Sequence, residues 1–205
     1  MKEDKALQER DAKVKSFMKE LLPKTEGINV DNLRKSFVEN NHHFSPNSAA
    51  FLAIKASEVR LRLDKNVLPI STSTVKHRFQ LVNMRQEVQS SIWHQLDQSQ
   101  KGLIKVCDYL TELGRLDRSF DYEGVIKYYV KVYGFTPKQL GYYIGLFEKH
   151  DVTIQVKYFK IRIMRDKDKK QLAEMPKWQV DKIWPALSNY QKDFFEKHHK
   201  VEANS

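Results

Sequence analysis

Hydrophobic residues recur every three or four positions through the first part of the chain, and this spacing predicts three helices. The first helix is expected to end before Pro23, because the residue that precedes a proline avoids helical geometry. Asp31 can cap a second helix over 32–40, and Ser45 followed by Pro46 supplies the N-cap and the first residue of a third helix. The inward-facing side chains are expected to be Leu7, Val14, Phe17, Met18, Leu21, Leu22, Leu33, Phe37, Ala49, Leu52, Ala53 and Ala56.

The hydrophobic period changes to two after the third helix, where residues 59–63 read Val-Arg-Leu-Arg-Leu. Such alternation predicts a strand with basic side chains on its outer face, and 67–70 is expected to be the return strand of a β-hairpin. Three helices followed by a hairpin is the order of elements in a winged helix. A competing interpretation extends the third helix to Lys65, because the apolar residues also fit helical spacing.

An internal repeat is indicated by the positions of the hydrophobic residues. A shift of about 92 residues places Val14 on Val106 and Leu21 on Leu113. After a gap of one residue, Phe-Ser-Pro at 44–46 falls on Phe-Thr-Pro at 135–137, so a helix cap repeats together with the pattern. The predicted fold is therefore mainly α with small β-hairpins. It consists of two duplicated helix-helix-helix-hairpin units, winged-helix-like, joined by a linker helix and followed by a C-terminal helix.

Four segments follow from this prediction. The first winged-helix-like unit spans 1–71, a linker helix spans 72–100, and the second unit spans 101–165. Residues 166–205 are expected to contain a charged, solvated loop and an aromatic C-terminal helix, in which Pro185 either bends the helix or starts a new one. The aromatic side chains would pack on the core or mediate homodimer formation. The apolar face of the linker helix would be formed by Val75, Phe79, Val82, Val88, Ile92 and Leu96.

The amino-acid composition narrows the range of possible functions. The chain of 205 residues carries 36 Lys and Arg against 26 Asp and Glu, a formal net charge of +10. A basic excess favours polyanionic partners, because each cation placed on a phosphate releases condensed counterions. Few glycines and prolines, 40% hydrophobic residues and a single cysteine exclude collagen-like, low-complexity and disulfide-stapled proteins. The absence of a spanning apolar window and of a secretory signal indicates a cytoplasmic protein that does not bind membranes.

Catalytic residues, metal ligands and cofactor motifs are not indicated. Cys107 lies on an apolar helical face, which predicts a small core residue and not a nucleophile. The histidine pairs at 42–43 and 198–199 are adjacent in sequence and lack the spacing of a helical metal site. The many tyrosines of the second half, including Tyr128, Tyr133 and Tyr158, could stack on single-stranded bases or pack into the core.

The segment Ile70–Phe79 resembles the recognition helix of helix-turn-helix proteins. It has a hydroxyl cap, a β-branched Val75 that we expect to be buried, and basic residues behind it. In that interpretation the hydroxyl side chains meet phosphates or base edges and the basic ones reach the DNA backbone. The alternative is a well-capped linker helix. The candidate DNA-binding residues of this segment are Ser71, Thr72, Thr74, Lys76, His77 and Arg78.

Other candidate DNA contacts come from the third helices and the hairpins. The third helix of each unit would enter the major groove, with Lys55 in the first unit and Lys138, Gln139 and Tyr142 in the second. Basic hairpin residues would hold phosphates and fix the register. Those residues are Arg60, Arg62, Lys157, Lys160 and Arg162.

The sequence thus predicts a non-enzymatic protein that binds double-stranded DNA without a cofactor. Its architecture is similar to that of plasmid replication initiators and of some bacterial or phage transfer and transcription regulators. Two other functions fit the same sequence. One is a protein–protein adaptor or assembly subunit that binds through the aromatic C-terminal helix, and the other is an RNA-binding component of a ribonucleoprotein, in which the tyrosines would contribute more.

Overall fold

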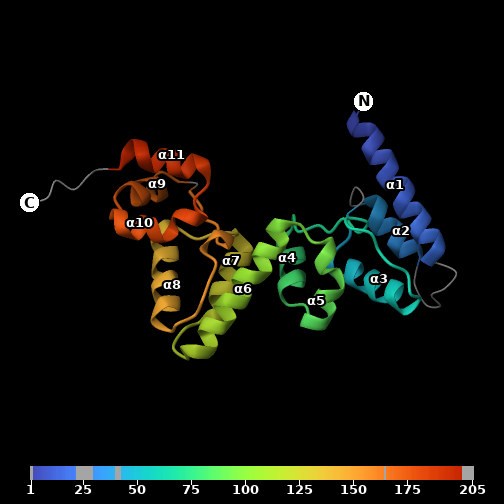
Figure 1. Ribbon diagram of the computed structural model, residues 1–205, viewed down its shortest axis with the longest axis horizontal. Helices are drawn as coiled ribbons and strands as arrows, with labels where there is room; N and C mark the ends of the chain where they lie inside the picture. Colours follow the sequence, from blue (N-terminus) through green and yellow to red (C-terminus); the bar gives the residue numbers. More distant parts are fainter. Residues whose placement is uncertain (1, 22–29, 40–42, 164, 200–205) are drawn as a thin grey trace, which may run out of the picture. The chain divides into compact units, whose positions relative to one another are not determined.

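The structure is a computed structural model that describes residues 2–21, 30–39, 43–163 and 165–199. It divides into two compact units, Met1–Lys101 and Gly102–Ser205, and Figure 1 labels their elements. The described helices of the first unit are α1 (Lys2–Leu21), α2 (Val30–Glu39), α3 (Pro46–Glu58), α4 (Val75–Val82), α5 (Gln86–Ile92), the short 3-10 helix η2 (Trp93–Gln95) and the start of α6 (Gln98–Leu116).

The second unit continues α6 and repeats this order of elements, with an additional 3-10 turn between its third and fourth helices. Within the first unit α3 packs against α4 and α5, and within the second unit α8 packs against α9 and α10. The described elements after α6 are α7 (Tyr122–Val132), α8 (Pro137–Lys149), the 3-10 turn η3 (Val156–Tyr158), α9 (Asp166–Ala173), α10 (Lys177–Ile183), the 3-10 helix η4 (Trp184–Ala186) and α11 (Asn189–His198).

Both third helices begin as the sequence predicts. The side chain of Ser45 accepts a hydrogen bond from the N–H of Ser48 at the start of α3, and Thr136 accepts one from Gln139 at the start of α8. A proline occupies the first turn of each helix, where its missing N–H costs nothing. The predicted caps at Ser45 and Thr136 are therefore confirmed.

The same main-chain pairing recurs in the two units at a spacing of 91 residues. Phe44 forms an isolated parallel bridge with Ile70, and Phe135 forms one with Ile161. In each bridge the phenylalanine N–H donates to the residue before the isoleucine, at 2.7 and 2.8 Å, and its carbonyl accepts from the residue after it, at 2.9 and 2.7 Å. Both phenylalanines are fully buried, so each bridge runs through the centre of its unit.

A buried glutamine completes each bridge. The side-chain amide of Gln100 donates to the Ile70 carbonyl at 2.6 Å, and Gln191 donates to the Ile161 carbonyl at the same distance. The amide oxygen of each glutamine accepts from the backbone N–H three residues earlier, at Asp97 or Ser188, and so caps its own helix. One side chain therefore joins a helix start to the bridge in both units.

The predicted β-hairpins and winged-helix wings are wrong. The β-pairings among the described residues are the two isolated bridges, and each unit is mainly helical. The chain after α3 turns at once, with a left-handed Arg60 (φ +57°), and turns again at Asn66 (φ +67°). Residue 70 then pairs with Phe44 and not with 59–63. The rival interpretation, a third helix that continues to Lys65, is also wrong because α3 ends at Glu58.

The second predicted hairpin fails for the same reason. Asp151 is left-handed after α8 (φ +54°), and Val156–Tyr158 form a 3-10 turn where a strand was expected. The charged run after it is not a loop, since α9 starts at Asp166 with acidic residues in its first turn, where the helix dipole favours them. Asp168 in this helix is buried and lies 3.4 Å from Arg165.

The continuous linker helix over 72–100 is also wrong. This segment contains α4, α5, η2 and the first residues of α6. The side-chain amide of Asn83 donates to the Phe79 carbonyl at 3.0 Å and ends α4, while Asp97 and Gln100 start α6. Val75, expected to be buried, is 37% exposed. Near the C-terminus a new helix, α11, starts after Pro185, which was one of the two alternatives.

The expected cores are largely present. Met18 is half-buried, Leu22 lies outside the described residues, and so does the side chain of Leu7. No helix in the described part of the chain combines the length and the hydrophobicity needed to cross a bilayer. The other inward-facing residues are all buried, namely Val14, Phe17, Leu21, Leu33, Phe37, Ala49, Leu52, Ala53 and Ala56.

Candidate nucleic-acid interface

A hollow of about 1020 Å³ lies in the first unit beside the loop that follows α3. Cationic residues line it from two separate parts of the chain: Arg60, Arg62 and Lys65 from the loop, and Lys101 from α6. Among the described residues that line it, Asp64 carries the one carboxylate. We call this feature the basic hollow, and its lining residues are Ala53, Ser57, Arg60, Leu61, Arg62, Leu63, Asp64, Lys65, Ser91, Trp93, His94 and Lys101.

An aromatic ring forms part of the wall of the basic hollow. Trp93 in η2 is 36% exposed, and the ammonium group of Lys101 lies 5.7 Å from the centre of its ring. A tryptophan face attracts a cation and can also stack on a planar ring. The hollow therefore combines positive charge with an accessible aromatic surface, which is the chemistry that binds a sugar–phosphate chain and its bases.

The end of α3 explains how Arg60 reaches this position. The N–H of Arg60 donates to the Ser57 carbonyl at 3.0 Å, and the N–H of Leu61 donates to the Ala56 carbonyl at 2.8 Å, which is the Schellman pattern of helix termination. Arg60 holds the left-handed position that glycine usually occupies, where a side chain costs roughly 1–2 kcal/mol.

The second unit shows which of these features the fold requires. It terminates α8 with the same Schellman pattern, and Asp151 is its left-handed residue. It also repeats the tryptophan–lysine pair, with Lys192 at 5.5 Å from the ring of Trp184. The residues equivalent to Arg60, Arg62 and Lys65 are Asp151, Thr153 and Val156, so the loop does not need basic residues at these three positions to fold. The positive charge of the basic hollow is specific to the first unit.

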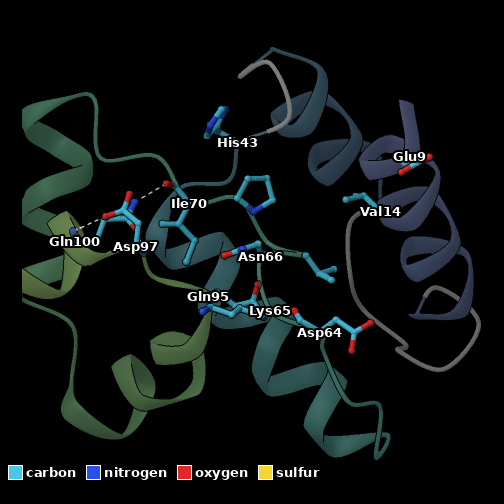
Figure 2. Close-up of a pocket in the computed structure, with 12 residues that line it drawn as sticks. Glu9, Val14, His43, Asp64, Lys65, Asn66, Ile70, Gln95, Asp97 and Gln100 are labelled. Carbon is cyan, nitrogen blue, oxygen red and sulfur yellow. Dashed lines mark hydrogen bonds between the residues drawn. The ribbon is translucent and has the colours of Figure 1, made fainter. Parts of the chain in front are cut away.

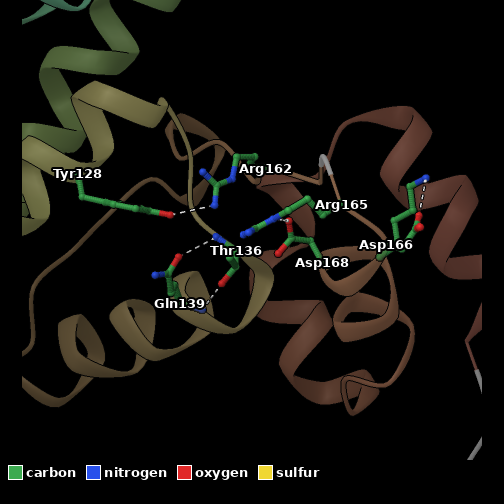
Figure 3. A network of polar contacts seen from close by, with 8 residues as sticks. Tyr128, Thr136, Gln139, Arg162, Arg165, Asp166 and Asp168 are labelled. Carbon is green, nitrogen blue, oxygen red and sulfur yellow. Dashed lines mark hydrogen bonds and ion pairs between the residues drawn. The ribbon is translucent and has the colours of Figure 1, made fainter.

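The predicted hairpin cations of the second unit lie against tyrosines. The Lys157 ammonium lies 5.4 Å from the ring centre of Tyr158, and that of Lys160 lies 4.1 Å from the ring centre of Tyr133. The Arg162 guanidinium donates to the Tyr128 hydroxyl at 3.0 Å, a contact that Figure 3 shows. Lys157, Lys160 and Arg162 are thus brought together with rings, although the hairpin that was expected to carry them is absent.

The segment likened to a recognition helix forms α4, with its hydroxyl groups engaged locally. The Thr74 side chain caps α4 by accepting from the N–H of His77 at 3.1 Å, and Thr72 lies 3.5 Å from the amide of Gln100. The Ser71 hydroxyl contacts Ser73 at 2.9 Å. Burial and the neighbouring Lys76 lower the pKa of His77, which disfavours a charged imidazole. Arg78 follows in the same helix, and none of these residues lines the basic hollow.

The remaining candidates of the third helices are dispersed. Lys55 forms an ion pair of 2.7 Å with Glu58. Gln139 is occupied by the capping box at the start of α8, where its side chain accepts from the N–H of Thr136 (Figure 3). Lys138 is exposed at the same helix end, and Tyr142 is 62% exposed further along α8. Lys55 does not line the basic hollow, and Lys138, Gln139 and Tyr142 belong to the second unit.

A smaller cavity of about 480 Å³ lies in the first unit, and two of the side chains that line it stabilise the fold. Figure 2 shows the side chains of Gln95 and Gln100 among its lining residues. The Gln95 amide accepts from the N–H of Leu68 at 3.0 Å and donates to the carbonyl of Asp64 at 2.6 Å. Because both buried amides are satisfied by the backbone, they hold the loop 64–70 in place and serve the fold.

Sequence reasoning missed Lys65, Trp93, His94 and Lys101 at the basic hollow. A signal for Trp93 was present, because Trp93 and Trp184 stand at equivalent positions of the repeat, each followed by a lysine eight residues later. Comparison of the chain with protein-family models, with curated proteins and with solved structures finds no match. Arguments about function therefore rest on the geometry of the chain itself.

No group of three or more metal-ligating side chains occurs within the described residues. Cys107 is buried, as the sequence predicts, and burial raises the pKa of its thiol to about 12. At pH 8 only about one thiol in ten thousand is then ionised, and the thiolate is the reactive form.

We expect Cys107 to react with a disulfide reagent at pH 8 at least about 100-fold more slowly in the native protein than in urea. The absorbance of the released thiolate measures both rates. The urea-unfolded chain is the control, since it shows that the thiol is intact. Rapid modification of the native protein would show that Cys107 is an accessible, activated thiol and would contradict its assignment to the core.

Proposed function

We propose that the protein binds nucleic acid non-enzymatically, through the sugar–phosphate backbone seated at the basic hollow. The observation that carries the proposal is that four cationic residues from two chain segments line one hollow beside an exposed tryptophan. Phosphates would contact Arg60, Arg62, Lys65 and Lys101, and Trp93 would contact a sugar or a base. The net charge of +10 would draw a polyanion towards the protein over longer distances.

Backbone phosphate is common to duplex DNA, single-stranded DNA and RNA. The experiment therefore measures which of these three ligands the protein binds. The full chain is titrated into a labelled duplex, a labelled single strand and a labelled RNA at several salt concentrations, with fluorescence anisotropy as the readout. We expect a linear log–log salt dependence equivalent to about four or more phosphates, at about −0.9 per phosphate for a duplex and −0.7 for a single strand. Absence of binding to all three probes at low salt would overturn the proposal.

A second candidate function is favoured by a different observation. Tyr142 on α8 and Trp178 on α10 are 62% and 61% exposed, on two helices that pack together. Exposed aromatic residues are enriched at protein interfaces, where they supply much of the binding energy. If the nucleic-acid titrations fail, an adaptor that binds a protein partner at α8 and α10 becomes the preferred function.

A further inference from the structure

Tyr158 in the second unit has two lysines near its ring, one from α6 and one from its own 3-10 turn. Its half-buried ring has the Lys105 ammonium of α6 at 5.1 Å and the Lys157 ammonium at 5.4 Å from its centre. The neighbouring residue on α6 is Gly102, and a Cβ added there would lie 3.5 Å from a ring carbon. The surroundings of Tyr158 are therefore cationic, with a glycine where a longer side chain would cover the ring.

Two further tyrosines of the second unit have a cationic side chain close to the ring in the same way. Lys160 lies over the half-buried ring of Tyr133, and Arg162 lies 5.8 Å from the ring centre of Tyr128 while it binds that hydroxyl. Tyr133 is held in the left-handed conformation (φ +51°) at the end of α7, a position that glycine or asparagine would adopt more easily. An aromatic side chain is thus retained at a strained backbone position.

The first unit lacks this chemistry although it forms the same bridge. Residues 157–162 read Lys-Tyr-Phe-Lys-Ile-Arg, and the equivalent residues 66–71 read Asn-Val-Leu-Pro-Ile-Ser. The buried positions agree, since Leu68 matches Phe159 and Ile70 matches Ile161. The other positions differ in residue type, so neither the tyrosine nor the cations are needed for the bridge. Each unit has a loop between its third helix and its bridge. The basic residues of this loop lie at its start in the first unit and at its end in the second unit.

We propose that the second unit binds the bases of single-stranded nucleic acid at the tyrosine–cation cluster formed by Tyr128, Tyr133 and Tyr158 with their cationic neighbours. The inference rests on the proposed function and adds to it a second contact of a different chemical kind. Unpaired bases would stack on the tyrosine rings while the lysine and arginine groups bind the flanking phosphates. The lysines can move off the rings at little cost, because a cation–ring contact at an exposed site is weak.

A single strand suits this cluster better than a duplex does. The bases of a duplex are already stacked on one another and present only their edges, whereas those of a single strand offer their faces. A site for phosphate alone would need the cations without the rings. The pairing of each cation with a tyrosine therefore favours a ligand that has both phosphates and free bases.

The test compares the affinity of the full chain for oligothymidine with that for an abasic strand of equal phosphate number. We expect the wild-type protein and Tyr158→Phe to bind oligothymidine about 10-fold more tightly than the abasic strand, and Tyr158→Leu, which removes one of the three rings, to show a clearly smaller preference. The phenylalanine variant is the matched control, because it keeps the ring and removes only the hydroxyl. Stacking on Trp93 contributes equally to all three proteins and cancels in the comparison.

The test distinguishes failure of the proposed function from failure of the tyrosine–cation cluster. If the wild-type protein binds neither strand, the proposed function itself is wrong. If it binds both strands equally, or if Tyr158→Leu keeps the wild-type preference, only the tyrosine–cation cluster is wrong. Should Tyr158→Leu fail to fold, Tyr133→Asn serves instead, because asparagine accepts the left-handed backbone and removes a ring. It is expected to reduce the preference for oligothymidine, and an unchanged preference would overturn the inference.

Discussion

Replacing Arg60 by aspartate together with Arg62 by threonine will weaken nucleic-acid binding about 100-fold at moderate salt. These are the residues that the second unit carries at the equivalent positions, Asp151 and Thr153, so the loop accepts them. Each arginine is expected to supply roughly 1.5 kcal/mol through a charge-assisted contact with a phosphate. The slope of log affinity against log salt should fall by the equivalent of about two phosphates.

A matched control separates the effect of where the charge lies from the effect of the net charge. Lys15→Glu with Lys35→Gln changes the net charge by the same three units at exposed sites on α1 and α2 that do not line the basic hollow. Fluorescence anisotropy with the same oligonucleotide measures all three proteins, and circular dichroism verifies that each is folded. If the control pair weakens binding as much as the arginine pair does, general electrostatic attraction explains the binding and the basic hollow does not.

Replacing Gln191 by leucine will lower the free energy of unfolding of the second unit by about 3 kcal/mol. Leucine leaves the buried Ile161 carbonyl without its donor, which costs roughly 1–3 kcal/mol, and removes the cap on the Ser188 N–H, worth roughly 1 kcal/mol. Gln100→Leu removes the equivalent contacts in the first unit. We therefore expect a loss of similar size for both variants.

Urea denaturation followed by circular dichroism measures these losses, with separate transitions fitted where the two units unfold independently. Gln191→Glu is the informative control, because a carboxylate can still accept from Ser188 but cannot donate to Ile161. It should cost nearly as much as Gln191→Leu. A destabilisation below about 0.5 kcal/mol for either variant would show that water replaces the glutamine and that the bridge does not depend on it.

The helices of this fold were predictable where their caps are visible in the sequence. Ser45-Pro46 and Thr136-Pro137 mark the starts of α3 and α8, and both starts are correct. The ends of these helices were not predictable in the same way. A Schellman end is usually signalled by glycine, but the left-handed residues here are Arg60 and Asp151. The alternating residues after them therefore read as strands, although they form irregular loops.

The candidate site was partly predictable for a similar reason. Arg60 and Arg62 stood out because consecutive basic residues alternate with apolar ones, and they do line the basic hollow. Trp93 and Lys101 join them only after the chain has folded through α4 and α5, which sequence analysis had merged into one helix. A site assembled from distant segments can be predicted only when the turns between them are predicted. The turn at Asn83 contains no glycine or proline, so the sequence does not indicate it.

The most direct test of the basic hollow is photochemical cross-linking. A single strand that carries a photoreactive thymidine analogue is irradiated with the full chain at low salt, and the cross-linked peptides are identified by mass spectrometry. We predict cross-links within 60–65 or at Trp93 and His94, and we predict that they are lost in the protein with Arg60→Asp and Arg62→Thr. Cross-links confined to peptides outside these segments, unchanged in that variant, would contradict the assignment of the basic hollow as the nucleic-acid site.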